Sequence, residues 1–160
     1  MRRHLAYLKY VLRHKWFVLV AGLSLRVPLW QLIIHDWHKF TPFEWFPYAR
    51  CFYKPNGEGQ YVETDAFNYA WNRHQKRGLH HWQAWLMTND DDGKTTPLKM
   101  PDRYVREMVA DWKGAGLAQG KPDTKAWYIF NEWNMLLHTQ TRERVIELLK
   151  IPRVRLEDGS

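Results

Sequence analysis

The chain has 160 residues, enough for one domain of ordinary size and hardly enough for two. Charged residues make up 26% and hydrophobic residues 45%, a globular composition that excludes disordered, collagen-like and disulfide-rich classes. The 24 basic and 17 acidic side chains give a net charge of +7, which permits an anionic partner but names none.

The N-terminal part of the chain carries a strong helical pattern. Apolar residues recur at steps of three and four from Arg3 to about Ala21, which predicts a first helix. Its apolar run at residues 16–25 falls short of the roughly 20 residues that span a bilayer, so we expect a buried helix and no membrane partner. Pro28 favours the start of a second helix, which runs into His35 and Asp36.

Two further helix starts carry capping signals. Residues 41–44 place a capping threonine, a proline and a carboxylate in the order of a capping box, and we interpret Glu44 mainly as part of that box. The following helix is expected to begin at Thr64 or Asp65 and to end at Gly78.

The C-terminal half continues the helical pattern, with Asp102 as a cap and Gly114 and Gly116 as a stop signal. The predicted helical segments are residues 80–87, 103–113, 124–137 and 141–150. No stretch alternates strictly between apolar and polar residues, so we predict an all-α domain with six to eight helices. The domain is expected to span residues 1–152, with a tail at residues 153–160.

Aromatic residues are abundant, and ten of them are tryptophans. Six tryptophans on predicted apolar faces are expected in the core, namely Trp71, Trp82, Trp85, Trp112, Trp127 and Trp133. Trp37, Phe40 and Trp45 surround the His35-Asp36 pair, where one of them could stack on a nucleobase, although a core role is favoured.

Histidine is the second unusual residue type, with eight copies beside a single cysteine. The lone Cys51 excludes an internal disulfide and a thiolate zinc site, and it favours the reducing cytoplasm. The histidines accompany carboxylates on separate predicted helices, and the candidate ligands are His14, His35, Asp36, His74, His80, His81 and Asp111, with Glu107 one turn before Asp111. Each histidine alone is more often structural, but a mixed nitrogen and oxygen set suits Mn, Fe, Co, Ni or Zn.

The order of these residues resembles the HD superfamily of metal-dependent phosphohydrolases, which combine a His, a His-Asp pair and a distant Asp on a helical bundle. The resemblance implies that His14, His35, Asp36 and Asp111 bind a metal, and that His74 with His80 or His81 binds a second ion. The sequence is most similar to an uncharacterised family from bacteria and phages with blocks like HDxSKF, PYARYF, HHWQ and MPxxYxxEMxADWxGAG. Here these blocks read HDWHKF at 35–40, PYARCF at 47–52, HHWQ at 80–83 and MPDRYVREMVADWKGAG at 100–116.

The resemblance implies hydrolysis of a phosphate ester, such as a nucleotide, by metal-activated water with one or two divalent ions. Lys39, Glu44 and Glu107 are the catalytic candidates, and Lys39 stands at a spacing where the superfamily often has a lysine. Cationic groups must also neutralise the phosphoryl oxygens, and the candidates are Lys39, Arg73, Arg77 and Arg106.

Two other functions stay open at this point. HD-like proteins with extra histidines can hold two irons and activate oxygen, which makes a di-iron oxygenase the first alternative. The second is a basic protein that binds nucleic acid without catalysis, because the first 50 residues carry eight basic and two acidic side chains. We rank it last, since these basic residues are scattered. The oligomeric state is left open, a homodimer included.

Overall fold

The structure is a computed structural model that describes residues 1–152, so the predicted tail at 153–160 lies outside the described residues. The described part contains seven α-helices, which confirms the prediction of an all-α bundle with six to eight helices. They are α1 (Arg2–Ser24), α2 (Leu29–Ile34), α3 (Pro42–Phe52), α4 (Asp65–Arg77), α5 (Asp102–Ala118), α6 (Thr124–Asn131) and α7 (Thr139–Leu148). No helix within residues 1–152 is long and apolar enough to cross a membrane.

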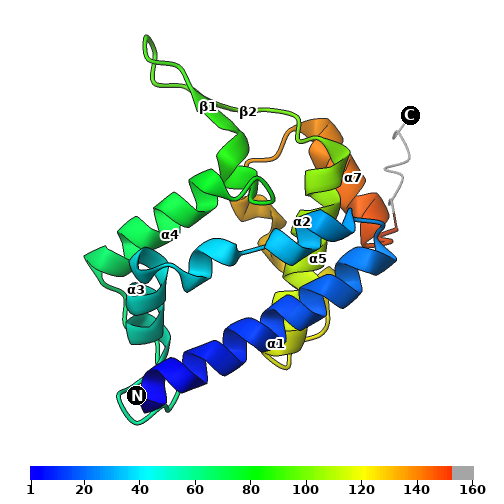
Figure 1. Ribbon diagram of the computed structural model, residues 1–160. Helices are drawn as coiled ribbons and strands as arrows, with labels where there is room; N and C mark the ends of the chain where they lie inside the picture. Colours follow the sequence, from blue (N-terminus) through cyan, green and yellow to red (C-terminus); the bar gives the residue numbers. More distant parts are fainter. Residues whose placement is uncertain (153–160) are drawn as a thin grey trace, which may run out of the picture.

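Short elements fill the connections between the helices. They are the 3₁₀ helices η1 (Trp37–Phe40), η2 (Trp82–Trp85) and η3 (Glu132–Asn134) and the strands β1 (Leu86–Thr88) and β2 (Thr95–Pro97). The two strands pair antiparallel and project from the helical body as a hairpin in Figure 1. The predicted helix over 80–87 is therefore wrong outside η2. The β-branched Thr88 and Thr95 face each other across the hairpin instead, with their hydroxyls 2.9 Å apart.

The observed helix ends agree with the predicted capping signals at some positions and differ from them at others. Thr64 caps α4 as predicted, because its hydroxyl accepts a hydrogen bond from the amide of Phe67. The predicted end of α5 at Gly114 is wrong, since the helix runs on to Ala118. Asp102 is its first residue rather than its cap. The helix predicted over 124–137 likewise ends early, at Asn131.

Gly114 continues α5 and packs directly against Val18 of α1. A Cβ atom at this position would come within 2.4 Å of Val18 Cγ2 and 2.8 Å of the Val18 backbone nitrogen. Glycine inside a helix costs about 1 kcal/mol relative to alanine, and here the close contact of the two helices offsets that loss. The glycine therefore serves helix packing and not helix termination.

We expect Gly114→Ala to destabilise the protein by about 1–3 kcal/mol, because the added methyl group must push α1 away from α5. Chemical denaturation of the purified variant measures this change. Gly59→Ala is the matched control, since no atom lies within 4 Å of the point that a Cβ atom would occupy there, and we expect a change within about 0.5 kcal/mol. Equal stabilities of the two variants would contradict the close helix contact.

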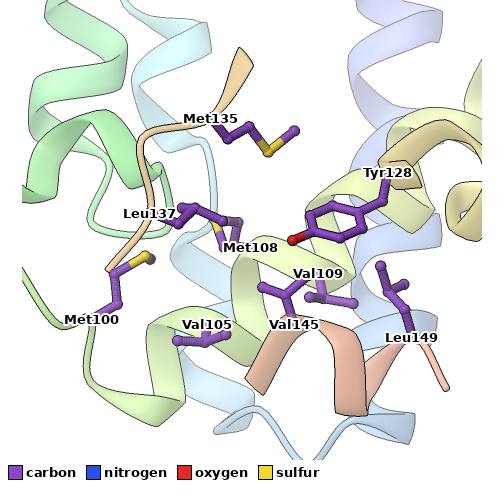
Figure 2. Close-up of a cluster of buried hydrophobic side chains, with 9 residues drawn as sticks. All are labelled: Met100, Val105, Met108, Val109, Tyr128, Met135, Leu137, Val145 and Leu149. Carbon is purple, nitrogen blue, oxygen red and sulfur yellow. The ribbon is translucent and has the colours of Figure 1, made fainter. Parts of the chain in front are cut away.

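Figure 2 shows the largest group of buried apolar side chains, which joins α5, α6 and α7. It is built from Val, Met, Leu and a single Tyr, and tryptophans only border it. None of the ten tryptophans, all within residues 1–152, is fully buried, and Trp71, Trp127 and Trp133 are 39%, 44% and 77% exposed. Trp37 and Phe40 are also exposed. The prediction of a tryptophan-rich core is wrong for these residues, because rings of this size rarely fit wholly inside a small domain.

Two smaller apolar groups lie along the buried face of α1. Tyr7 and Val11 join the group shared with α3 and α4, whereas Val18 and Ala21 join the group shared with α2 and α5. His14 lies between these two pairs on the same face and is 2% exposed. The helix thus carries a polar side chain into the centre of the bundle, where two apolar groups meet.

Candidate metal centre

Polar side chains gather where α1, α4 and α5 meet the segment between α2 and α3. All seven metal ligands predicted from the sequence are brought together here: His14, His35, Asp36, His74, His80, His81 and Asp111. Two groups of their donor atoms share Asp36, and a third group joins His35 and His80 with Glu107; within each group the atoms lie within 4.8 Å of one another. Six of the seven side chains are buried, and His81 is half-buried. The sequence therefore identified the members of this cluster.

The first group contains His14, His35, Asp36 and Asp111. His14 Nε2 lies 3.2 Å from Asp36 Oδ2 and 3.1 Å from Asp111 Oδ1. His35 Nε2 lies 3.4 Å and 3.3 Å from the same two oxygens. Two nitrogens and two oxygens from α1, α5 and the end of α2 thus converge on one point.

The second group contains Asp36, His74, His80 and His81. His74 Nε2 and His80 Nε2 lie 3.3 Å and 3.5 Å from Asp36 Oδ1, the other oxygen of the shared carboxylate. Within the described residues, the Nε2 atoms of His74, His80 and His81 have no hydrogen-bond partner although they are buried. Buried polar atoms normally have partners, so three free imidazole nitrogens beside a carboxylate are typical of a ligand site.

The backbone at Asp36 explains how two adjacent residues reach one site. Asp36 adopts the left-handed conformation, with φ 56° and ψ 22°, directly after the end of α2. Aspartate tolerates this conformation better than most residues, and it turns the Asp36 carboxylate toward the His35 ring. The ammonium group of Lys15 on α1 donates to the carbonyl oxygens of Ile33 and His35 and so holds the end of α2 in place.

Gly78 allows the close approach of the adjacent pair His80 and His81. A Cβ atom on Gly78 would lie 2.8 Å from His81 Cδ2 and 3.2 Å from His80 Cε1. The sequence predicted this glycine as a helix end, and α4 does end at Arg77. The structure adds that its missing side chain leaves space for the two imidazole rings.

Two glutamates lie behind the histidines, on the side away from the shared carboxylate. His35 Nδ1 lies 2.9 Å from Glu107 Oε1, and His74 Nδ1 lies 2.9 Å from Glu44 Oε2. Glu44 is 2% exposed and does not close the predicted capping box, and the Thr41 hydroxyl donates to the His38 carbonyl instead. The capping interpretation is wrong because the buried His74 ring takes the carboxylate. Hydrogen bonds of this kind fix a ring and point its Nε2 inward.

The charges of the cluster depend on one another. Burial opposes ionisation of Asp36 and Asp111, but the surrounding histidines, with Lys39 beside Asp36, outweigh it and hold both pKa values well below the usual range. Burial likewise opposes protonation of His35, yet the adjacent carboxylates raise its pKa well above the usual value. Burial and the nearby His35 lower the pKa of His80 to about 3. His80 is therefore neutral at pH 7 and free to donate a lone pair.

The predicted cationic residues separate into two sets. Lys39 Nζ lies 2.5 Å from Asp36 Oδ2, and Arg77 borders a small cavity beside His35 and His80. Arg73 is not brought to the cluster, because its guanidinium stacks 4.5 Å above the Phe43 ring. Arg106 is not brought there either, since it pairs with Asp102 at 2.8 Å and donates to the carbonyl oxygens at the end of α1.

Two cavities border the cluster. The larger one, about 520 Å³, borders His14, His74, His81 and Asp111, and the smaller one, about 160 Å³, borders His35 and His80. Asp36 lines only the smaller cavity and Lys39 only the larger one.

Sequence reasoning missed three residues of the site. Gln31 is buried on α2 and donates to Glu107, so it holds the carboxylate behind His35. Its position one turn before His35 on an apolar helix is the signal that would have found it. Tyr7 and Tyr48 line the larger cavity, and no motif or spacing in the sequence singles them out.

Comparison with known proteins gives one family. Neither the curated proteins nor the solved structures include a match to this chain. The model of a family of unknown function, DUF5662, matches residues 3–151, which include the whole cluster. The chain therefore belongs to the DUF5662 family.

Proposed function

We propose that this protein is a metal-dependent phosphohydrolase whose centre would hold two divalent transition-metal ions, with Asp36 as the ligand that the two sites have in common. The observation that carries the proposal is the position of this carboxylate. Its Oδ2 faces His14 and His35, and its Oδ1 faces His74 and His80. A carboxylate between two sets of imidazoles is suited to bridge two cations, and the resemblance to the HD superfamily supports the same assignment.

The distances between the donor atoms support the proposal that they bind a metal ion. Two ligands about 2.1 Å from one ion lie about 3.0 Å apart at a right angle and about 3.4 Å apart in a tetrahedron. The nitrogen and oxygen atoms of the first group lie 3.1–3.4 Å apart, which fits a shared ion. A mixed nitrogen and oxygen set favours Mn, Fe, Co, Ni or Zn over Ca or Mg.

The residues around this centre have separable roles in the proposed reaction. A divalent ion bound there would lower the pKa of a water molecule and polarise a phosphoryl oxygen. Lys39 borders the larger cavity and can neutralise a non-bridging oxygen of the ester, so we propose it as the catalytic cation. We assign Glu44 and Glu107 as positioning residues, because each holds an imidazole from behind. Hydrolysis joins the water oxygen to phosphorus and breaks the ester P–O bond, and the leaving alcohol takes up a proton.

Elemental analysis of the purified protein tests the metal site. We expect up to two equivalents of a transition metal in the wild type and a clear loss in His35→Ala, with phosphate released from nucleotides when Mn²⁺ or Co²⁺ is added. His138→Ala is the control, because His138 lies outside the cluster and caps α7. Should His35→Ala misfold, Asp111→Asn removes a ligand with little change of shape. Negligible metal in wild type and variants alike, even after supplementation, would refute the site.

Replacing Glu44 or Glu107 should weaken the binding of the metal without removing one of the proposed ligands. We expect Glu44→Gln and Glu107→Gln each to lower metal affinity by about ten- to a hundredfold, since an amide holds the imidazole less firmly than a carboxylate. Competition with a chromophoric chelator measures the dissociation constants. Glu132→Gln is the matched control, because Glu132 pairs with Arg142 at 3.1 Å, away from the centre. Unchanged affinity in both test variants would argue against their positioning role.

The three imidazoles of the second group favour a second candidate, a di-iron oxygenase of the HD type, because imidazole also suits iron. That enzyme would retain iron on aerobic purification and consume oxygen with a suitable substrate. The hydrolase would release phosphate regardless of oxygen. Nucleic-acid binding is less favoured, since Arg3, Lys15 and Lys39 of the basic N-terminal part already bond to groups of the chain itself.

A further inference from the structure

The larger cavity connects the proposed centre with a wall of aromatic side chains. On α1, Tyr10 stands one turn before His14, and the two rings stack with their centroids 6.2 Å apart. On α4, Trp71 stands one turn before His74 in the same way, at 5.6 Å. Each of these helices thus presents a proposed ligand and, one turn away, a ring that faces the same cavity.

Further rings complete this wall. The aromatic residues that line the cavity are Tyr7, Tyr10, Tyr48, Phe52, Tyr61, Phe67 and Trp71. They come from α1, α3, α4 and the loop before α4, so rings border the cavity from several directions. With about 520 Å³, the cavity has the size of a site for a small organic molecule. A flat ring fits such a site, because it stacks on aromatic faces.

The inner part of the cavity carries donors suited to an anion. Among the described residues, the hydroxyls of Tyr7 and Tyr48 have no hydrogen-bond partner, although both side chains are 2% exposed. Burial raises the pKa of both phenols, which keeps them neutral and able to donate. Lys39 lines the same cavity. Two free O–H donors and one ammonium group beside a metal-ligand cluster form a suitable cradle for phosphoryl oxygens.

The charges that line the cavity favour a single phosphate group. Lys39 is the only lysine or arginine among its lining residues within 1–152, whereas Glu63 and Asp111 supply two carboxylates. A polyphosphate or a nucleic-acid strand needs several cations along its length. One lysine and the proposed ions can neutralise one phosphate, and a longer anion would meet Glu63.

We propose that the larger cavity binds a phosphate monoester whose alcohol carries a flat aromatic ring. Its phosphate lies against Lys39 and the hydroxyls of Tyr7 and Tyr48, and its ring lies between the aromatic side chains of α1, α3 and α4. The inference rests on the proposed phosphohydrolase function, because it takes the metal centre as the phosphate end of the site. It adds the substrate class and two tyrosines that contact it.

The affinities of two phosphonates for the Mn²⁺-saturated protein test whether the cavity binds an aromatic ring. Phenylphosphonate and methylphosphonate both carry the phosphoryl group on a C–P bond that the proposed hydrolysis does not break, and only the first carries a ring. We expect phenylphosphonate to bind at least about tenfold more tightly in isothermal titration calorimetry, since stacking on aromatic side chains contributes that much. Trp71→Leu should bring the two affinities together, whereas the control Trp127→Leu, which lies outside this cavity, should leave their ratio unchanged.

Tyr48→Phe tests the phosphate end with little risk to the fold, because the hydroxyl it removes has no partner elsewhere in the described chain. We expect both phosphonates to bind about tenfold more weakly, with their ratio preserved. Equal affinity of the two phosphonates in the wild type would overturn the ring assignment. Failure of both phosphonates to bind, or full affinity in Tyr48→Phe, would overturn the assignment of the phosphate-binding group. If both bind as expected and no ester is hydrolysed, the hydrolase proposal fails and this inference stands.

Discussion

Asp36→Asn is expected to abolish both proposed metal sites at once and to reduce the proposed phosphate release by about a thousandfold or more. The reason is that both groups of donors share this one carboxylate. Loss of a single preorganised electrostatic group already reduces rates by about 10²–10³. Asparagine is the replacement of choice, because it also tolerates the left-handed backbone at this position. Elemental analysis and a phosphate assay on the same sample measure the two effects.

His14→Ala is the informative comparison for this variant. His14 belongs to the first group only, so we expect it to lose one equivalent of metal and to retain the other. Circular dichroism of both variants is the control that checks whether they remain folded. If Asp36→Asn kept as much metal as His14→Ala, the bridging role of Asp36 would be wrong.

Acidification of the metal-free protein is expected to lower its melting temperature steeply below about pH 6.5. The folded-state pKa of His80 is lowered to about 3 by burial and by His35, and the pKa of His81 is also well below the ordinary value. The unfolded chain therefore binds more protons than the folded one between about pH 6.5 and 3, and stability falls as pH falls. Below about pH 4, loss of the ionised Asp36 and Asp111 adds to the decline.

His35 has the opposite effect on the pH dependence of stability, and this effect appears at higher pH. Its pKa is raised, so its stabilising contribution is complete below about pH 6.5 and is lost as pH rises through the folded-state value. Calorimetry of the chelator-treated protein should therefore show maximal stability near neutral pH. In His80→Asn this position cannot titrate, so the fall in melting temperature between pH 6.5 and 4 should be much smaller. The control His138→Asn should show the same fall as the wild type. Identical profiles for His80→Asn and the wild type would contradict this account.

Much of the helical framework could be predicted, because its signals are local. Thr64 caps α4, Gly78 follows its end, and the apolar periodicity of α1 places His14 on the buried face. The sequence order of the His-Asp pair, the three later histidines and Asp111 also selected the ligand candidates. What periodicity could not supply was their convergence, which depends on the approach of α1 to α5 and on the left-handed turn at Asp36.

Three of the wrong predictions share a cause, because each takes for a local signal a residue that contacts another segment of the chain. Gly114 has the local pattern of a helix stop, but it lies against Val18 of another helix. Glu44 has the spacing of a capping residue, but it reaches His74, 30 positions along the chain. Arg106 precedes the acidic pair of α5 as a phosphate-binding residue would, but it binds Asp102 one turn away and the end of α1. Residues of this kind acquire their partners only when the whole chain is folded.

The hydroxyls of Tyr7 and Tyr48 bear on the balance between the stability of this domain and its capacity to bind a ligand. A buried donor left unsatisfied costs about 1–3 kcal/mol, and among the described residues each phenol is such a donor. Phenylalanine would fill the same space without that loss, so a chain selected only for thermal resistance would carry phenylalanine at both positions. Under the proposed binding mode, the phosphate of a ligand would accept hydrogen bonds from both hydroxyls and so restore the stability that the ligand-free protein forgoes.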